Sequence, residues 1–342
     1  MQIKRRILKN EDLHSLVARL QLLPWKKEQI FLSQKFTSLL KRALKPRTAM
    51  SAAAVLRQKV KSKKSSLDGF GNHAPMVEDL MPDNFLVQAK RQPIKEVPPA
   101  LLQHTIGAQS MEHFHRSALE HIAFFESATL KHAGRRMDEL EHVLNFGCGA
   151  GRLLSMLPVT TKAAGGEPNG PLIDFASKAL PHCDIYQSMP EPPLKWGDET
   201  FDLVYAYSVF SHLREDSEQR WLRELLRVGK PGCTYLLTVQ GDWWLQSKFD
   251  AATQARIEAS GFWYFDIHQS KGSAMDFFDN YGSSIHTSDY VKQKWAELFE
   301  IQQVYFGRPP ALFDHDGLSD VHRQALTKCR ALGQDLVVMR KR

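Results

Sequence analysis

Three glycines alternate in a short segment that follows an apolar run. They stand at Gly147, Gly149 and Gly151, in the pattern G-x-G-x-G. Glycine permits a sharp turn and lets a ligand lie directly against the backbone. A helix after the turn would direct free amide groups and its positive dipole end toward that ligand. We therefore expect a ligand-binding loop here, although a glycine-rich turn alone can be purely structural.

Two neighbouring features indicate the kind of ligand. The sixth position of the dinucleotide pattern G-x-G-x-x-G is Arg152 here, and not glycine. A helix that begins over a pyrophosphate usually needs that glycine, so the shorter pattern favours S-adenosylmethionine over NAD. Glu167 follows Gly147 by twenty residues, at the end of the second expected strand. A carboxylate there can bind both ribose hydroxyls, which supports an adenosine ligand without choosing between the two cofactors.

Alternating strands and helices must position these residues. We expect a parallel sheet with helices on both faces, because apolar strands and amphipathic helices alternate along the chain. The expected strands are residues 142–146, 163–167, 185–188, 201–207, 234–239, 301–306 and 335–339. The expected helices are residues 111–131, 151–157, 172–180, 218–228, 247–259, 288–299 and 319–331, with an aromatic-rich loop at 261–281.

Three segments resemble one enzyme family in order and spacing. Val143 to Arg152 (VLNFGCGAGR) resembles motif I of the class I S-adenosylmethionine-dependent methyltransferases. Phe201 to Leu213 (FDLVYAYSVFSHL) resembles the fourth strand and following turn of that family, and Arg227 to Val239 (RVGKPGCTYLLTV) resembles the start of its fifth strand. More loosely, residues 278–342 resemble the C-terminal part of a bacterial subgroup that acts on small molecules or glycans.

The resemblance implies a fold and a cofactor. The fold is α/β and Rossmann-like, with a seven-stranded, mostly parallel sheet, helices on both faces and an antiparallel last strand pair. The cofactor is S-adenosyl-L-methionine. The glycines would pack against its methionyl and ribose parts, and Glu167 would bind the ribose hydroxyls.

Further contacts are also implied by the resemblance. Ser188 and Met189 would border the adenine, and Tyr207 and Ser208 would lie near the methionyl group and sulfonium. Two residues depart from the family: Asn145 replaces a usual acidic residue, and Ser188 replaces an aspartate that often meets the adenine amino group. The predicted cofactor-binding set is Asn145, Gly147, Cys148, Gly149, Gly151, Glu167, Pro168, Ser188, Met189, Tyr207 and Ser208.

Two histidines are candidates for a general base, which would help if the acceptor is a hydroxyl. His212 follows the fourth expected strand by a few residues, and His286 lies in the tail that would cover the pocket. Each histidine can equally be structural. The histidines before the first strand form no convincing metal-ligand pattern with carboxylates, so we predict no metal.

Composition limits the class of protein. Hydrophobic residues make up 43% of the 342 residues, which excludes a wholly disordered chain. No run of eighteen apolar residues occurs, so we expect no transmembrane helix. The four cysteines form no Cys-x-x-Cys pair, which favours a reduced, cytoplasmic protein. Residues 1–66 hold 17 Lys and Arg against 3 Asp and Glu, whereas the rest of the chain is acidic.

This charge asymmetry suggests the domain organisation. We predict a basic amphipathic helical segment at 1–42, a basic linker and Pro-containing lead-in at 43–99, and a methyltransferase domain at 100–342. The core of that domain would be residues 138–240, and 241–342 would cover the substrate. Residues 1–66 are a candidate contact for a membrane surface or an anionic polymer, with a solvated tail as the alternative. No sequence-specific nucleic-acid partner is expected.

We therefore predict an S-adenosylmethionine-dependent methyltransferase that modifies a small molecule or glycan at oxygen. One alternative is an NAD-dependent oxidoreductase on a related sheet. The other is a non-catalytic module that binds S-adenosylmethionine and transfers nothing. The sequence leaves the acceptor and the oligomeric state open.

Overall fold

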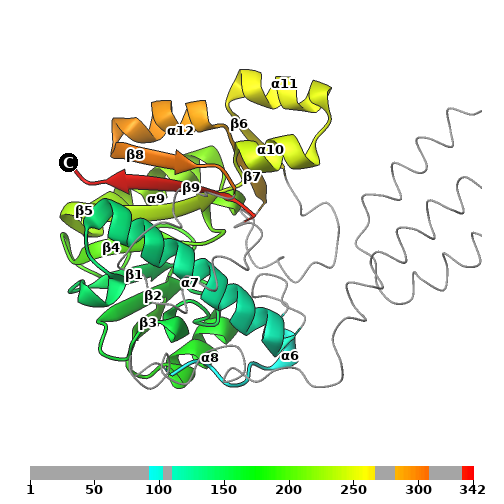
Figure 1. The fold of residues 1–342 in the computed structure, drawn as a ribbon. Coiled ribbons are helices and arrows are strands. Elements are labelled where there is room, and N and C mark those ends of the chain that lie inside the picture. The colour runs from blue at the N-terminus through cyan, green and yellow to red at the C-terminus, as the bar shows by residue number, and fades with distance from the viewer. Residues whose placement is uncertain (1–91, 103–109, 266–281, 308–332) are drawn as a thin grey trace, which may run out of the picture. The chain divides into compact units, whose positions relative to one another are not determined.

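The structure is a computed structural model that describes residues 92–102, 110–265, 282–307 and 333–342 (Figure 1). All of them belong to the second of two compact units, Ala74–Arg342. The helical segment, the linker and the helix expected at 319–331 lie outside the described residues, as does most of the loop at 261–281. The predicted domain boundaries therefore stay predictions.

Seven strands form one sheet in the order β3-β2-β1-β4-β5-β9-β8 (Figure 1). The first five in this order pair in parallel, and β9 pairs antiparallel with both β5 and β8. The predicted fold class, including the antiparallel last strand pair, is confirmed. The strands are β1 (Val143–Phe146), β2 (Ala163–Glu167), β3 (Asp184–Gln187), β4 (Phe201–Ala206), β5 (Gly229–Val239), β8 (Glu300–Tyr305) and β9 (Asp335–Arg340).

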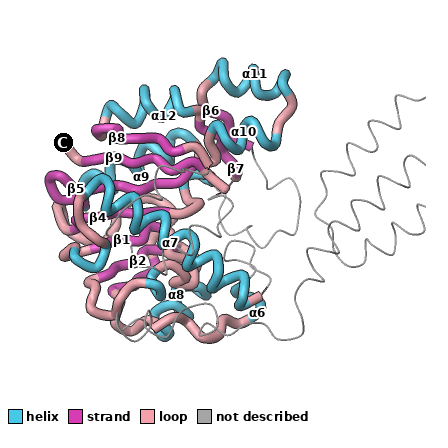
Figure 2. Tube along the Cα trace, viewed as in Figure 1, coloured by secondary structure: helices cyan, strands magenta, loops and turns pink. Residues whose placement is uncertain are grey.

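Helices cover both faces of this sheet, as Figure 2 shows. Helices α7 (Met111–Ala133) and α8 (Gly170–Ala179) pack on one face, and α9 (Glu215–Val228) and α12 (Ser288–Lys294) on the other. Side chains alternate along each strand, so successive residues of β4 enter different cores. Leu203 and Tyr205 face α7 and α8, whereas Val204 and Ala206 face α9.

The prediction of a helix directly after the glycine loop is wrong. Residues 151–157 form turns and a short 3₁₀ helix, Leu154–Met156. Gly151 has φ +79°, which no α-helix accommodates, and Pro158 forces Leu157 into an extended conformation with ψ 150°. The glycine loop is therefore not backed by a regular helix.

The region after β5 differs from the prediction in three places. The helix expected at 247–259 is two helices, α10 (Asp242–Lys248) and α11 (Ala251–Ser260), because Asp250 caps the second one through the Thr253 amide. The helix expected at 288–299 ends early and continues as a 3₁₀ turn, Trp295–Glu297. Part of the expected aromatic loop is a strand, β6 (Phe262–Phe265), which pairs with β7 (Ser283–His286).

Shorter elements complete the described chain. They are α6 (Pro99–Leu102) and the 3₁₀ turns Met137–Glu139 and Phe210–His212. Ile94 and Val97, in the Pro-containing lead-in, are already buried in the core beneath α7. Among the described helices, none has the length and apolarity that a membrane crossing requires.

Candidate functional site

The glycine loop is locked to the end of the neighbouring strand. The amides of Gly147 and Cys148 both donate to the carbonyl oxygen of Gly166, at 2.9 and 3.2 Å. A Cβ on Gly147 would lie 2.2 Å from a methyl of Val209, and one on Gly151 would lie 2.7 Å from a methyl of Leu180. Both glycines also have a positive φ. Packing and backbone conformation therefore require glycine at these two positions.

Gly149, between them, lies in a different environment. Its φ is +55°, but a Cβ built there would meet no atom of the described residues within 4 Å. Its amide donates to Oε2 of Glu167 at 3.1 Å. The space above Gly149 is thus next to the Glu167 carboxylate. A ligand that lies on the loop and binds a carboxylate through its hydroxyls would require this arrangement.

The Glu167 carboxylate is held by the loops at the ends of β1 and β2. Oε2 accepts from the Gly149 amide, and Oε1 accepts from the Asn169 amide at 3.1 Å. Burial raises the pKa of Glu167, and the two amide hydrogen bonds oppose that rise. Each carboxylate oxygen can accept more than one hydrogen bond, so both can also serve a ligand.

We expect Glu167→Ala to weaken S-adenosylmethionine binding by about 1–3 kcal/mol, because two polar contacts with the ligand would be lost. Isothermal titration calorimetry measures this change. Glu167→Gln is the matched control, since it keeps the length of the side chain and one acceptor oxygen. Equal affinity of Glu167→Ala and the wild type would contradict the assignment.

Two predicted cofactor residues direct their side chains into the protein. The Asn145 amide nitrogen donates to the Tyr205 carbonyl of β4 at 3.3 Å, and Asn145 is 1% exposed. The Cys148 sulfur lies against Gly165, 2.8 Å from where a Cβ would stand, and burial raises the pKa of its thiol. Both side chains contact other parts of the protein in these positions. Contact of either residue with the cofactor stays a prediction.

The predicted adenine side is formed by the chain after β2 and β3. The Ser188 amide donates to the Glu167 carbonyl at 3.1 Å, which fixes the two chain segments to each other. Ser188 is buried, whereas Met189 is 68% exposed, and the carbonyl of Pro168 accepts from the Gln187 side chain. Contact of Ser188 and Met189 with the adenine stays a prediction.

A hydrogen-bonded network lies next to the loop, at the carboxyl end of β4. Ser208 has φ +59°, a left-handed conformation that costs free energy in a residue with a side chain. The Thr238 hydroxyl accepts from the Ser208 amide at 2.8 Å and donates to the Gln334 side-chain oxygen at 2.6 Å. The Gln334 side-chain nitrogen donates to the Ser208 hydroxyl at 2.8 Å. Thr238 and Gln334 thereby hold Ser208 in its strained conformation.

His212 adjoins this network. Its Nδ1 lies 2.7 Å from the Gly282 carbonyl, and its Nε2 lies 3.5 Å from the Ser208 hydroxyl. A carbonyl can only accept, so Nδ1 carries the proton and Nε2 is the basic nitrogen of the neutral ring. Burial lowers the pKa of His212, which outweighs the opposite effect of the Gly282 carbonyl. His212 is therefore a neutral imidazole with a fixed orientation at neutral pH, and its role as a base stays a prediction.

His286, the other predicted base, is a core residue. Its side chain is fully buried, and Nε2 makes a very short contact with Glu218 of α9. The same carboxylate accepts from Tyr290 at 3.0 Å and from Trp295 at 2.8 Å. This cluster fastens the C-terminal elements to α9. We therefore correct the interpretation of His286 to a structural one, since a buried, paired ring cannot meet an acceptor.

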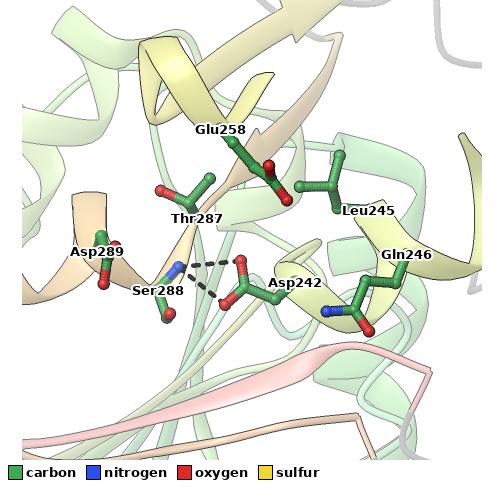
Figure 3. Close-up of a pocket in the computed structure, with 7 residues that line it drawn as sticks. All are labelled: Asp242, Leu245, Gln246, Glu258, Thr287, Ser288 and Asp289. Carbon is green, nitrogen blue, oxygen red and sulfur yellow. Dashed lines mark hydrogen bonds between the residues drawn. The ribbon is translucent and has the colours of Figure 1, made fainter. Parts of the chain in front are cut away.

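Two polar clusters lie apart from the predicted residues. A cavity of about 330 Å³ is lined by Asp242, Leu245, Gln246, Glu258, Thr287, Ser288 and Asp289. Figure 3 shows the Asp242 carboxylate turned toward the Ser288 amide, from which it accepts. At the opposite end of the sheet, Glu141, His142 and Asp202 are close enough to share an ion. The Lys230 ammonium already neutralises both carboxylates there.

A family model described as a methyltransferase domain matches residues 144–237, which include the glycine loop, Glu167 and His212. Residues 144–237 thus form a methyltransferase domain. The strand order of this domain, with β9 antiparallel between β5 and β8, is the one that the sequence resemblance implied. The methyltransferase domain indicates S-adenosylmethionine as the cofactor.

Several solved structures are similar to this methyltransferase. An S-adenosylmethionine-dependent methyltransferase from Methanosarcina mazei is 15% identical, with 62% of this chain and 96% of that one covered and a TM-score of 0.41. One from Mesorhizobium loti is 14% identical, with 64% and 100% covered and a TM-score of 0.39. Geranyl diphosphate C-methyltransferase from Streptomyces coelicolor A3(2) is 10% identical, with 64% and 77% covered and a TM-score of 0.40.

Proposed function

We propose that this methyltransferase transfers a methyl group to a hydroxyl of a small molecule or glycan, with His212 as general base. The observation that carries the proposal is the orientation of His212, whose Nδ1 is fixed on the Gly282 carbonyl while Nε2 faces the Ser208 hydroxyl. A neutral imidazole with one nitrogen so fixed can take a proton from an oxygen nucleophile.

The cofactor supplies a methyl carbon that positive sulfur has already activated. The protein has to align the acceptor and keep water away. The space above Gly149 and the Glu167 carboxylate suit the nucleoside part, and the Tyr207 ring would face the sulfonium. The proton released from the acceptor would pass to Nε2 of His212.

The function is tested by incubating the protein with methyl-labelled S-adenosylmethionine and size-fractionated cell extract. We expect label in a small-molecule or glycan fraction, in a bond that resists mild alkali as an ether does. Label in protein or nucleic acid would contradict the proposed acceptor class. Cofactor binding without transfer to any fraction would favour the non-catalytic module.

A further inference from the structure

The hydrogen bonds around Ser208 determine the direction in which its hydroxyl donates. The Thr238 hydroxyl accepts from the Ser208 amide and donates to the side-chain oxygen of Gln334, 2.6 Å away. Because that oxygen is engaged, the Gln334 side-chain nitrogen faces the Ser208 hydroxyl at 2.8 Å, and this nitrogen can only donate. The Ser208 oxygen is therefore an acceptor in this contact, and its own proton is left for another partner.

Nε2 of His212 and the Ser211 hydroxyl both lie within reach of the Ser208 proton. The Ser208 oxygen is 3.5 Å from Nε2 and 3.1 Å from the Ser211 oxygen. Nε2 carries no proton, because Nδ1 holds the proton that it donates to the Gly282 carbonyl. Ser211 accepts from the Gln334 nitrogen at 3.4 Å and can itself donate to Ser208. Donation from Ser208 to Nε2 is thus the arrangement that gives each of these donors an acceptor.

The position of Ser208 brings this hydrogen bond to the reacting groups. Ser208 follows Tyr207 at the carboxyl end of β4, where the sequence resemblance puts the methionyl group and the sulfonium. Its left-handed φ of +59° is held by its neighbours, and strained residues of this kind are concentrated at active sites. We expect the acceptor hydroxyl, which must lie beside the transferred methyl group, to meet the Ser208 oxygen before it meets the His212 ring.

We propose that Ser208 relays the proton of the acceptor hydroxyl to His212. The inference rests on the proposed function, because it needs the same acceptor and the same base. As the acceptor oxygen bonds to the methyl carbon, its proton moves to the Ser208 oxygen, and the original Ser208 proton moves to Nε2. The cofactor sulfur keeps the electron pair of the bond that breaks. The products are a methyl ether, an uncharged thioether and the His212 imidazolium, which releases its proton to water.

The relay needs one free lone pair on the Ser208 oxygen. One lone pair accepts from Gln334, and the other faces the Ser211 hydroxyl. A serine hydroxyl proton rotates about its C–O bond, so Ser211 can give way to the acceptor hydroxyl. Ser208 would thus be a catalytic residue, whereas Thr238 and Gln334 would be positioning residues that keep its proton directed at His212.

Ser208→Gly tests the relay, because it removes the hydroxyl and leaves a residue that adopts a positive φ readily. At saturating S-adenosylmethionine, kcat for transfer of labelled methyl into the acceptor fraction identified with the wild type should fall by about 10²-fold. Cofactor affinity, measured by calorimetry, should stay within about twofold. Ser217→Ala is the matched control and should keep the wild-type kcat, because the buried Ser217 hydroxyl donates to Glu191 instead.

A double variant separates the relay from an independent role of Ser208. Because the relay acts only through the base, Ser208→Gly combined with His212→Gln should be no more than about twofold slower than His212→Gln alone. Losses that multiply would overturn the relay. A wild-type kcat in Ser208→Gly beside a slow His212→Gln would also overturn it, and both results would leave the proposed function standing.

Failure of the proposed function gives a different result. A wild type that transfers label to no fraction, or a His212→Gln variant as fast as the wild type, would remove the base and the relay with it. Should Ser208→Gly fail to fold, Ser208→Ala lacks the same hydroxyl and decides by the same comparisons.

Discussion

Gly149→Val should abolish S-adenosylmethionine binding, with a loss of more than about a hundredfold in affinity, while the protein stays folded. Within the part of the chain that the structure describes, a Cβ at Gly149 meets no atom within 4 Å, so the valine would project into the space where the cofactor is expected. The positive φ of +55° adds a conformational cost of about 1–2 kcal/mol, which is small beside the stability of an ordinary domain. Calorimetry measures the loss of affinity, and circular dichroism shows whether the protein stays folded.

Gly134→Val is the matched control. Gly134 ends α7 with φ +67°, and a Cβ there also meets none of the described atoms within 4 Å. The two substitutions therefore carry similar backbone strain and a similar lack of clashes, and they differ in whether a ligand should lie beside them. Both should lower the midpoint of thermal unfolding by a similar amount. Unchanged affinity in Gly149→Val, or an equal loss in both variants, would refute the cofactor loop.

The part of the site that the sequence predicted is local in the chain. Gly147, Gly149 and Gly151 lie within one turn, and Glu167 ends the next strand, so pattern and spacing alone bring them together. The sheet was also predictable, because apolar strands alternated with amphipathic helices. Even in this part of the site, the prediction of a helix directly after the loop is wrong. Gly151 in a left-handed conformation and Pro158 closing the segment leave room only for a 3₁₀ turn.

The part of the site that was not predicted depends on contacts between segments that are far apart in the sequence. Gln334 meets Ser208 across 126 positions of the chain, and nothing in either local sequence indicates the other. Thr238 is a polar residue in an apolar strand, but the sequence does not indicate its hydrogen-bond partners. Strand β6 was interpreted as loop because its four residues are all aromatic, and its partner β7 begins well beyond it in the sequence.

His286 shows the same limit for chemistry. A histidine near the expected pocket can be a base or a core residue. The contact of His286 with Glu218, 68 positions away in the chain, shows that it is a core residue. For His212 the deciding partner was Gly282, 70 positions away, whose carbonyl fixes the tautomer. The residue type and its place after a strand therefore select candidates, but the partner on another element determines what each ring can do.

His212→Gln should lower the rate of methyl transfer by about 10²–10⁴-fold and leave S-adenosylmethionine affinity within about twofold. Glutamine fills similar space and can still reach the Gly282 carbonyl, but it cannot take a proton. The rate is measured as transfer of labelled methyl into the acceptor fraction identified with the wild type. His182→Gln is the control, because His182 precedes β3 at the other end of the sheet and should transfer at the wild-type rate.

The pH dependence gives an independent test of the same base. His212 must be neutral to accept a proton, and burial lowers its pKa from 6.5. The rate should therefore be constant near pH 7 and fall as the pH drops through a value below 6.5, where the ring becomes protonated. In His212→Gln that acidic limb should disappear from the residual rate. A limb that persists in the variant would assign the titration to another group, and a limb above pH 6.5 would contradict a buried neutral histidine as the base.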